Sequence, residues 1–189
     1  MTEPADFDLD KILDGAKHTQ KTVRLYLNGD AAARAVDLNL ALLEAKSAED
    51  PEEEKARTKE LKDLLADLEA ESLEVTLRAL ATEEVNVIRR IVVKDNPIPT
   101  RDPEEMKRLK ETERTELAMI HLLSNAIIGA KHGDAETSGF SIEEVSKLRR
   151  SLPSAEWDKL TKTYDDVQAG TAVFEGLMAD PTFRWGFAD

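Results

Sequence analysis

At 189 residues, the chain is long enough for one domain and short for two, and its 41% apolar and 34% charged residues are typical of a soluble, helix-rich protein. The absence of cysteine excludes a disulfide framework and thiolate chemistry. A net charge of −13, with only small basic clusters interleaved with acids, argues against nucleic-acid binding, and no apolar run reaches the roughly 18 residues that a membrane span needs.

The N-terminal region predicts a short helix followed by a strand. The first residues lack the apolar stretch of a secretory signal, and Asp8 is placed to cap a helix that starts at Leu9 and ends near Gly15. Residues 22–27 (TVRLYL) alternate apolar and polar side chains, which is the period of a strand. The turn that follows leads into a helix, and we expect Asp30 to be its N-cap.

Two charged, leucine-rich helices are predicted within residues 31–71, with a break near Asp50 and Pro51. The second helix carries leucines at helical spacing. In the first helix, one apolar stripe is widened by two further leucines. The stripe consists of Val36, Leu40 and Leu43, and the two widening residues are Leu38 and Leu42.

A second alternating segment, residues 72–80 (SLEVTLRAL), follows the two helices. Helices joined by a short loop pack antiparallel, so the two flanking strands meet and pair antiparallel. The predicted unit is a two-stranded ribbon that carries a helical arm roughly 25–30 Å long. Because an isolated ribbon is marginal in water, later helices or another subunit must cover its apolar face. That face consists of Val23, Leu25, Val75 and Leu77.

The remainder of the chain predicts helices. One spans residues 82–93, and a Pro-containing linker occupies residues 94–102. Asp102 and Pro103 then start a helix that we expect to reach Ala130. Two further helices begin at the capping residues Ser141 and Ser154. The predicted organisation is an N-terminal region (1–93), the linker and a C-terminal helical region (103–189).

The fold class predicted from these elements is mainly α, with a small two-stranded antiparallel β ribbon, a helical hairpin arm inserted between the two strands and a helical C-terminal half. We expect no catalytic constellation, because the chain has no G-x-S-x-G nucleophile motif and no phosphate-binding glycine loop. The sequence therefore argues against an enzyme, and we expect no cofactor.

Metal binding is also not expected. The three histidines, His18, His121 and His132, lack the spacing of zinc ligands. Residues 134–145 resemble an EF-hand loop at their start, but Val145 stands where the bidentate glutamate belongs. A flexible connection followed by a capping box accounts for the same residues.

The helical hairpin has two interpretations. It is either an ordinary hairpin packed on the core, or an arm that clasps a helix of another protein or a second copy of the chain. The candidate partner-binding residues on the arm are Leu38 and Leu42. The tail adds Phe183, Trp185 and Phe187, which form either a docking strip or a lid on the helical core.

Three segments carry a resemblance to a known family: TVRLYLNGD, VTLRAL and FSIEEVSKLRRSLPSAEWDKL. In this order, and over about residues 6–167, the chain resembles the tail assembly chaperones of long-tailed phages and prophages of actinobacteria. The resemblance implies a protein of the host cytoplasm that binds the long helical tape-measure protein before the tail tube polymerises around it. It also implies recruitment of tail tube subunits.

A structural component of the virion, such as a tail or connector adaptor subunit that assembles into a ring, is the alternative. A ring requires self-complementary surfaces and a uniform oligomer. The two alternatives differ in whether the protein remains in purified particles.

Overall fold

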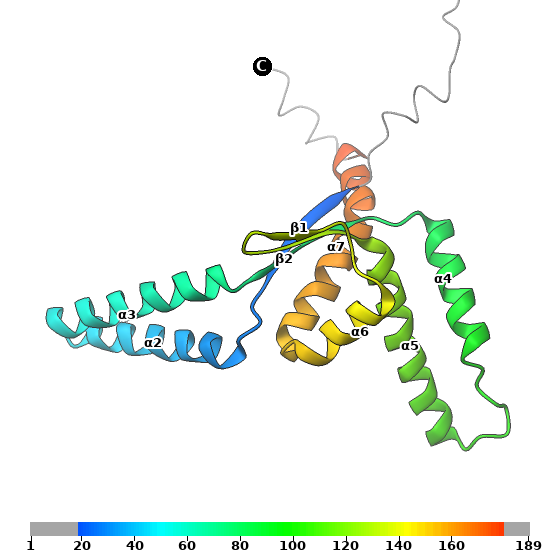
Figure 1. Ribbon diagram of the computed structural model, residues 1–189, viewed down its shortest axis with the longest axis horizontal. Coiled ribbons are helices and arrows are strands. Elements are labelled where there is room, and N and C mark those ends of the chain that lie inside the picture. The colour runs from blue at the N-terminus through cyan, green and yellow to red at the C-terminus, as the bar shows by residue number, and fades with distance from the viewer. Residues whose placement is uncertain (1–18, 180–189) are drawn as a thin grey trace, which may run out of the picture.

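The computed structural model describes the backbone of residues 19–179 and the side chains of residues 19–170. The helix expected from Leu9 and the aromatic tail lie outside these residues. Helices dominate the described part, and some of them pack on one face of a small antiparallel sheet (Figure 1). The mainly α character and the two predicted strands are confirmed, and the strands occupy β1 (Gln20–Leu25) and β2 (Leu73–Arg78).

The sheet has four strands rather than the predicted two. Its order is β1-β2-β3-β4, where β3 is Ile127–His132 and β4 is Ala135–Thr137, and all neighbours are antiparallel. The prediction of a two-stranded ribbon was therefore wrong in the number of strands, although its two strands pair antiparallel as expected, with Leu25 opposite Leu73.

The two additional strands come from a segment that we had assigned to a helix and a connection. The helix expected to reach Ala130 ends at Ala126, and the chain then turns back beside β2. A two-residue loop of Gly133 and Asp134 joins β3 to β4, and Gly133 has a φ of 56°, as a type II′ hairpin loop requires at its first position. After α5 ends, the backbone N–H and C=O groups of β3 are satisfied by pairing with β2 instead of by helical hydrogen bonds.

One face of the sheet forms the core. Val23, Leu25, Val75 and Leu77 are all buried there, so the apolar face of the predicted ribbon is covered by later helices of the same chain, as expected. The covering helices are α5 (Glu104–Ala126) and α7 (Ser154–Ala179), and α6 (Ile142–Ser151) packs on α5.

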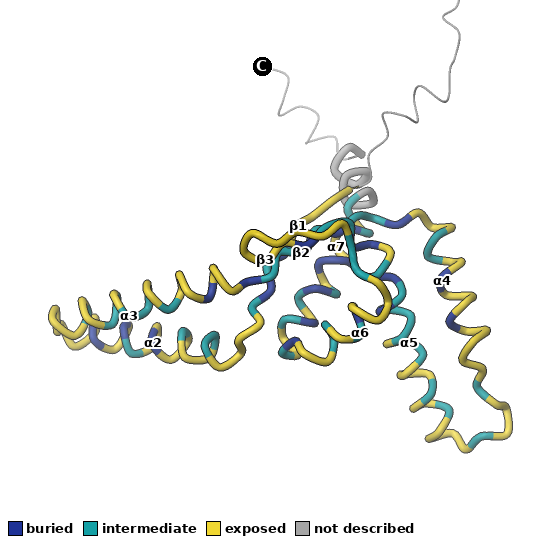
Figure 2. Tube along the Cα trace, viewed as in Figure 1, coloured by how far each residue is buried: buried dark blue, intermediate teal, exposed yellow. Residues whose placement is uncertain are grey.

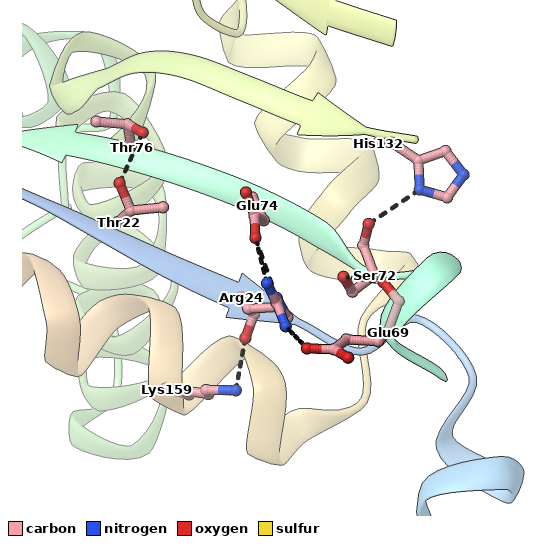
Figure 3. Close-up of polar contacts among 8 residues, drawn as sticks. All are labelled: Thr22, Arg24, Glu69, Ser72, Glu74, Thr76, His132 and Lys159. Carbon is pink, nitrogen blue, oxygen red and sulfur yellow. Dashed lines mark hydrogen bonds and ion pairs between the residues drawn. The ribbon is translucent and has the colours of Figure 1, made fainter. Parts of the chain in front are cut away.

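The opposite face of the sheet is polar. Thr22 and Thr76 lie opposite each other, with 3.0 Å between their hydroxyl oxygens (Figure 3). Beside them, Arg24 pairs with Glu74 at 2.6 Å, and Lys131 stands opposite Glu74 in the next strand. The outer strand adds Glu136, whose carboxylate lies 3.4 Å from the Lys131 ammonium. Charges thus alternate in sign across four strands, which favours hydration of this face.

The insertion between β1 and β2 consists of α2 (Gly29–Ser47) and α3 (Pro51–Ala70). Asn28, rather than the predicted Asp30, caps α2, because its side chain accepts a hydrogen bond from the Ala31 amide at 3.0 Å. Asp50 caps α3 and is followed by Pro51 at the first helical position. The two helices pack on each other and project away from the sheet as an arm (Figure 1).

A second helical hairpin lies between β2 and β3. Its helices are α4 (Thr82–Asp95) and α5, and the Pro-containing residues 96–103 connect them at the end distant from the sheet (Figure 1). The core cluster contains Leu80 and Ile88 from before this connection and Leu160 from after it. Residues from both predicted regions therefore share one core.

The capping box at the start of α6 is confirmed. The Ser141 hydroxyl accepts a hydrogen bond from the Glu144 amide, and the Glu144 carboxylate accepts hydrogen bonds from the Ser141 amide (2.7 Å) and hydroxyl (2.8 Å). These hydrogen bonds, with the backbone one contributing most, hold the pKa of Glu144 below its ordinary value of 4.5. A carboxylate with a lowered pKa stabilises the fold above its ordinary pKa, and this contribution is lost as the pH falls.

We therefore expect the melting temperature of Glu144→Gln to lie below that of the wild type at pH 7, and the difference to shrink as the pH falls below 4.5. Thermal unfolding followed by circular dichroism between pH 7 and pH 3 measures it. The matched control is Glu143→Gln, which removes a charge from the same helical turn but no cap hydrogen bond. A difference independent of pH would contradict the assignment.

Candidate partner-binding surface

Helix α2 carries apolar side chains on two opposite sides. Leu38, Leu42 and Ala45 are buried and face α3. The second set is exposed and consists of Val36 (60% exposed), Leu40 (54%) and Leu43 (53%). At about 100° per residue, these two sets lie on roughly opposite sides of the helix. We call Val36, Leu40 and Leu43 the outer stripe.

The candidate residues Leu38 and Leu42 are thus placed inside the hairpin, where they contact α3 rather than solvent. They are inaccessible to a partner while the two helices remain packed. Leu68 is the buried residue of α3, and Leu61 and Leu64, on the same side of that helix, are half-buried. The accessible apolar residues of α2 are those of the outer stripe, which the sequence analysis treated as the main stripe but did not assign to a partner.

An acidic row runs beside the outer stripe. Asp30, Asp37 and Glu44 are spaced seven residues apart, so they fall on one line along α2. None of the three forms an ion pair with another described residue, whereas Arg34 and Lys46 pair with Glu60 and Glu54 of α3. Residues 29–71 contain 13 acidic and 6 basic side chains, so the arm is strongly negative.

The base of the arm is tied to the sheet by polar contacts (Figure 3). The Arg24 guanidinium bridges Glu74 of β2 and Glu69 at the end of α3, and these hydrogen bonds raise its pKa. The Ser72 hydroxyl donates to the Glu69 carbonyl at 2.7 Å, and the Ser72 carbonyl lies 3.1 Å from Nδ1 of His132. The arm thus leaves the sheet at a defined position, although α2 and α3 pack mainly on each other.

A cavity of about 640 Å³ lies between α5 and the α6–α7 pair. The Arg149 guanidinium lies 5.2 Å from the centroid of the Trp157 ring and forms an ion pair with Glu116 at 2.7 Å. The described side chains that line this cavity include threonines and carboxylates but no histidine, lysine or cysteine. The cavity is therefore an open polar cleft with an ion pair in its wall, and its described lining holds no nucleophile paired with a histidine base.

Among the described residues, no group of three or more histidine, cysteine, aspartate or glutamate side chains is arranged to hold a metal ion. The segment that resembled an EF-hand loop instead forms β4 and the connection to α6. His18 and the tail residues Phe183, Trp185 and Phe187 lie outside the described residues, so their roles stay predictions.

The two sides of α2 predict a large and a small effect on stability for the same leucine-to-aspartate substitution. We expect Leu42→Asp to destabilise the arm by roughly 2–5 kcal/mol, because it removes a buried side chain and buries a charge. Leu40→Asp, two residues away on the exposed side, should change stability by less than about 0.5 kcal/mol. Hydrogen exchange of the amides in residues 29–70 measures the difference. Equal loss of protection in both variants would show that the outer stripe is also packed.

No helix within residues 19–179 is long and apolar enough to span a membrane. Comparison of the chain with protein-family models, with curated proteins and with solved structures gave no match.

Proposed function

We propose that the protein is a non-enzymatic phage tail assembly chaperone that binds the helical tape-measure protein in the host cytoplasm and keeps it soluble until the tail tube forms. The observation that carries this proposal is the arm, which exposes an apolar stripe on the side of α2 that faces away from α3. Figure 2 shows the arm as two mostly exposed helices with few buried positions.

The shape of the outer stripe favours a helical partner. Val36, Leu40 and Leu43 follow the i, i+4, i+7 spacing, which is the pattern by which one helix packs along another. The acidic row beside them favours a partner whose own apolar stripe is flanked by lysine or arginine. The resemblance implies a tape-measure protein that is long and helical and exposes apolar surface along its length.

The size of the stripe favours weak, reversible binding. Full burial of an aliphatic side chain contributes roughly 1.5–3 kcal/mol, and each residue of the stripe is already about half covered. Three such residues contribute about 3–4 kcal/mol, which corresponds to a Kd near 1 mM before the entropic cost of association. Many weakly bound copies would cover a long client and could still be displaced one by one as the tube grows.

The strong negative charge of the arm supports the same role. Acidic surfaces repel each other and add solubility to a complex whose client is apolar. Recruitment of tail tube subunits is part of the proposed function, but we assign no surface to it.

The proposal is tested by co-expression with the tape-measure protein encoded beside the gene, followed by size-exclusion chromatography. We expect the client to be soluble and to co-elute with the wild-type chain. With the Val36→Asp/Leu40→Asp variant, less than half of that amount of client should co-elute. Leu65→Asp, at an exposed leucine of α3 outside the stripe, is the matched control and should retain it.

A contrary result favours the structural alternative. If the client stays insoluble with the wild-type chain, and this chain elutes as a defined ring-sized oligomer that is also found in purified particles, the protein is a structural component of the virion instead.

A further inference from the structure

The second hairpin carries a groove that is complementary to the outer stripe. This groove lies between α4 and α5 and has a volume of about 360 Å³. Its apolar lining comes from both helices, and an arginine stands on each wall. The lining residues are Arg89, Val92 and Val93 of α4, and Arg114, Thr115, Ala118, Met119 and Leu122 of α5.

The two arginines give the groove a positive rim. Neither Arg89 nor Arg114 forms an ion pair with another residue in the described part of the chain, although this part contains many carboxylates. In the sequence, Arg89 belongs to a small basic cluster, and Arg114 stands between acidic and polar neighbours. In the structure they flank an apolar surface, and such a surface binds an apolar segment that carries acidic neighbours.

The outer stripe has this chemistry. Its three aliphatic side chains lie beside Asp30, Asp37 and Glu44, none of which is paired within the described residues. The lengths also match. At 1.5 Å per residue, the stripe from residue 36 to residue 43 spans about 10 Å, and the α5 wall of the groove from residue 114 to residue 122 spans about 12 Å.

We propose that α2 of one copy docks its outer stripe in the α4–α5 groove of a second copy, with the acidic row of one facing Arg89 and Arg114 of the other. The arm and the groove belong to different hairpins, which project from the sheet in different directions (Figure 1). Two copies can form this contact reciprocally and close as a dimer, or each arm can reach a further copy, which builds an open chain or a closed ring.

A symmetric contact between two outer stripes is disfavoured by charge. Each arm has 13 acidic and 6 basic side chains, so two arms side by side would place like charges together. If the proposed function holds, a stripe covered by a neighbouring copy is unavailable to the client. Client-free copies then mask each other's stripes, and the client competes with self-association.

Charge reversal tests the contact without any client. One variant, Asp37→Lys/Glu44→Lys, makes the row beside the stripe basic, and the other, Arg89→Glu/Arg114→Glu, makes the rim of the groove acidic. We expect the wild type to form oligomers that grow with concentration in sedimentation velocity at low salt, and each variant alone to associate at least tenfold more weakly. An equimolar mixture of the two variants should regain association. In the mixture, the row made basic in one variant meets the acidic groove rim of the other, and the acidic row of the second variant meets the basic rim of the first.

Recovery in the mixture also shows that both variants fold, and circular dichroism of each variant provides an independent control. A wild type that stays monomeric up to millimolar concentration overturns the proposal. So does association of either variant at wild-type strength, or a mixture of two folded variants that remains monomeric. Since no client is present, these outcomes leave the chaperone function to be judged by co-expression alone.

Discussion

Antiparallel pairing of neighbouring strands is the constraint that organises the molecule. Because β1 and β2 run in opposite directions, the chain that leaves β1 must return to the same end of the sheet, and α2 and α3 make that excursion. The same rule applies between β2 and β3, where α4 and α5 leave from the opposite end and return to it. Two helical hairpins thus project from one small sheet, and most of the exposed aliphatic side chains within residues 19–170 lie on them.

Local patterns in the sequence predicted the first of these excursions well. The alternation in residues 22–27 and 72–80 gave β1 and β2 to within a few residues, and the proline after Asp50 marked the turn of the arm. The helices of the second excursion were predicted, but the strand to which they return was missed, because Leu117, Ile120, Leu123 and Ile127 continue a helical spacing past the end of α5. The strand that follows exists through its pairing with β2, a contact about fifty residues away along the chain that no local pattern reveals.

The partner-binding surface shows the same limit. Sequence periodicity predicted a single stripe of Val36, Leu40 and Leu43 widened by Leu38 and Leu42, whereas in the structure these two leucines lie on the opposite, buried side of α2. Which side faces α3 depends on how the two helices rotate against each other, and periodicity does not give that rotation. The groove between α4 and α5 left no sequence signal beyond scattered arginines, since its two walls lie about 25 residues apart in the chain. By contrast, the sheet face with Arg24, Glu74, Lys131 and Glu136 is polar and largely ionic, so it offers little for an apolar partner.

The junction between arm and sheet has a further consequence. The arm enters after Leu25 and exits before Leu73, and these two residues are paired opposite each other in the ladder. A short turn could close the same ladder, so the arm is an insertion whose length is independent of the sheet. Equal numbers of residues added to α2 and α3 would extend it by about 1.5 Å per residue pair without moving a core side chain. The arm is therefore an exchangeable module, which evolution or an engineer can lengthen, shorten or re-face while the sheet and its covering helices stay unchanged.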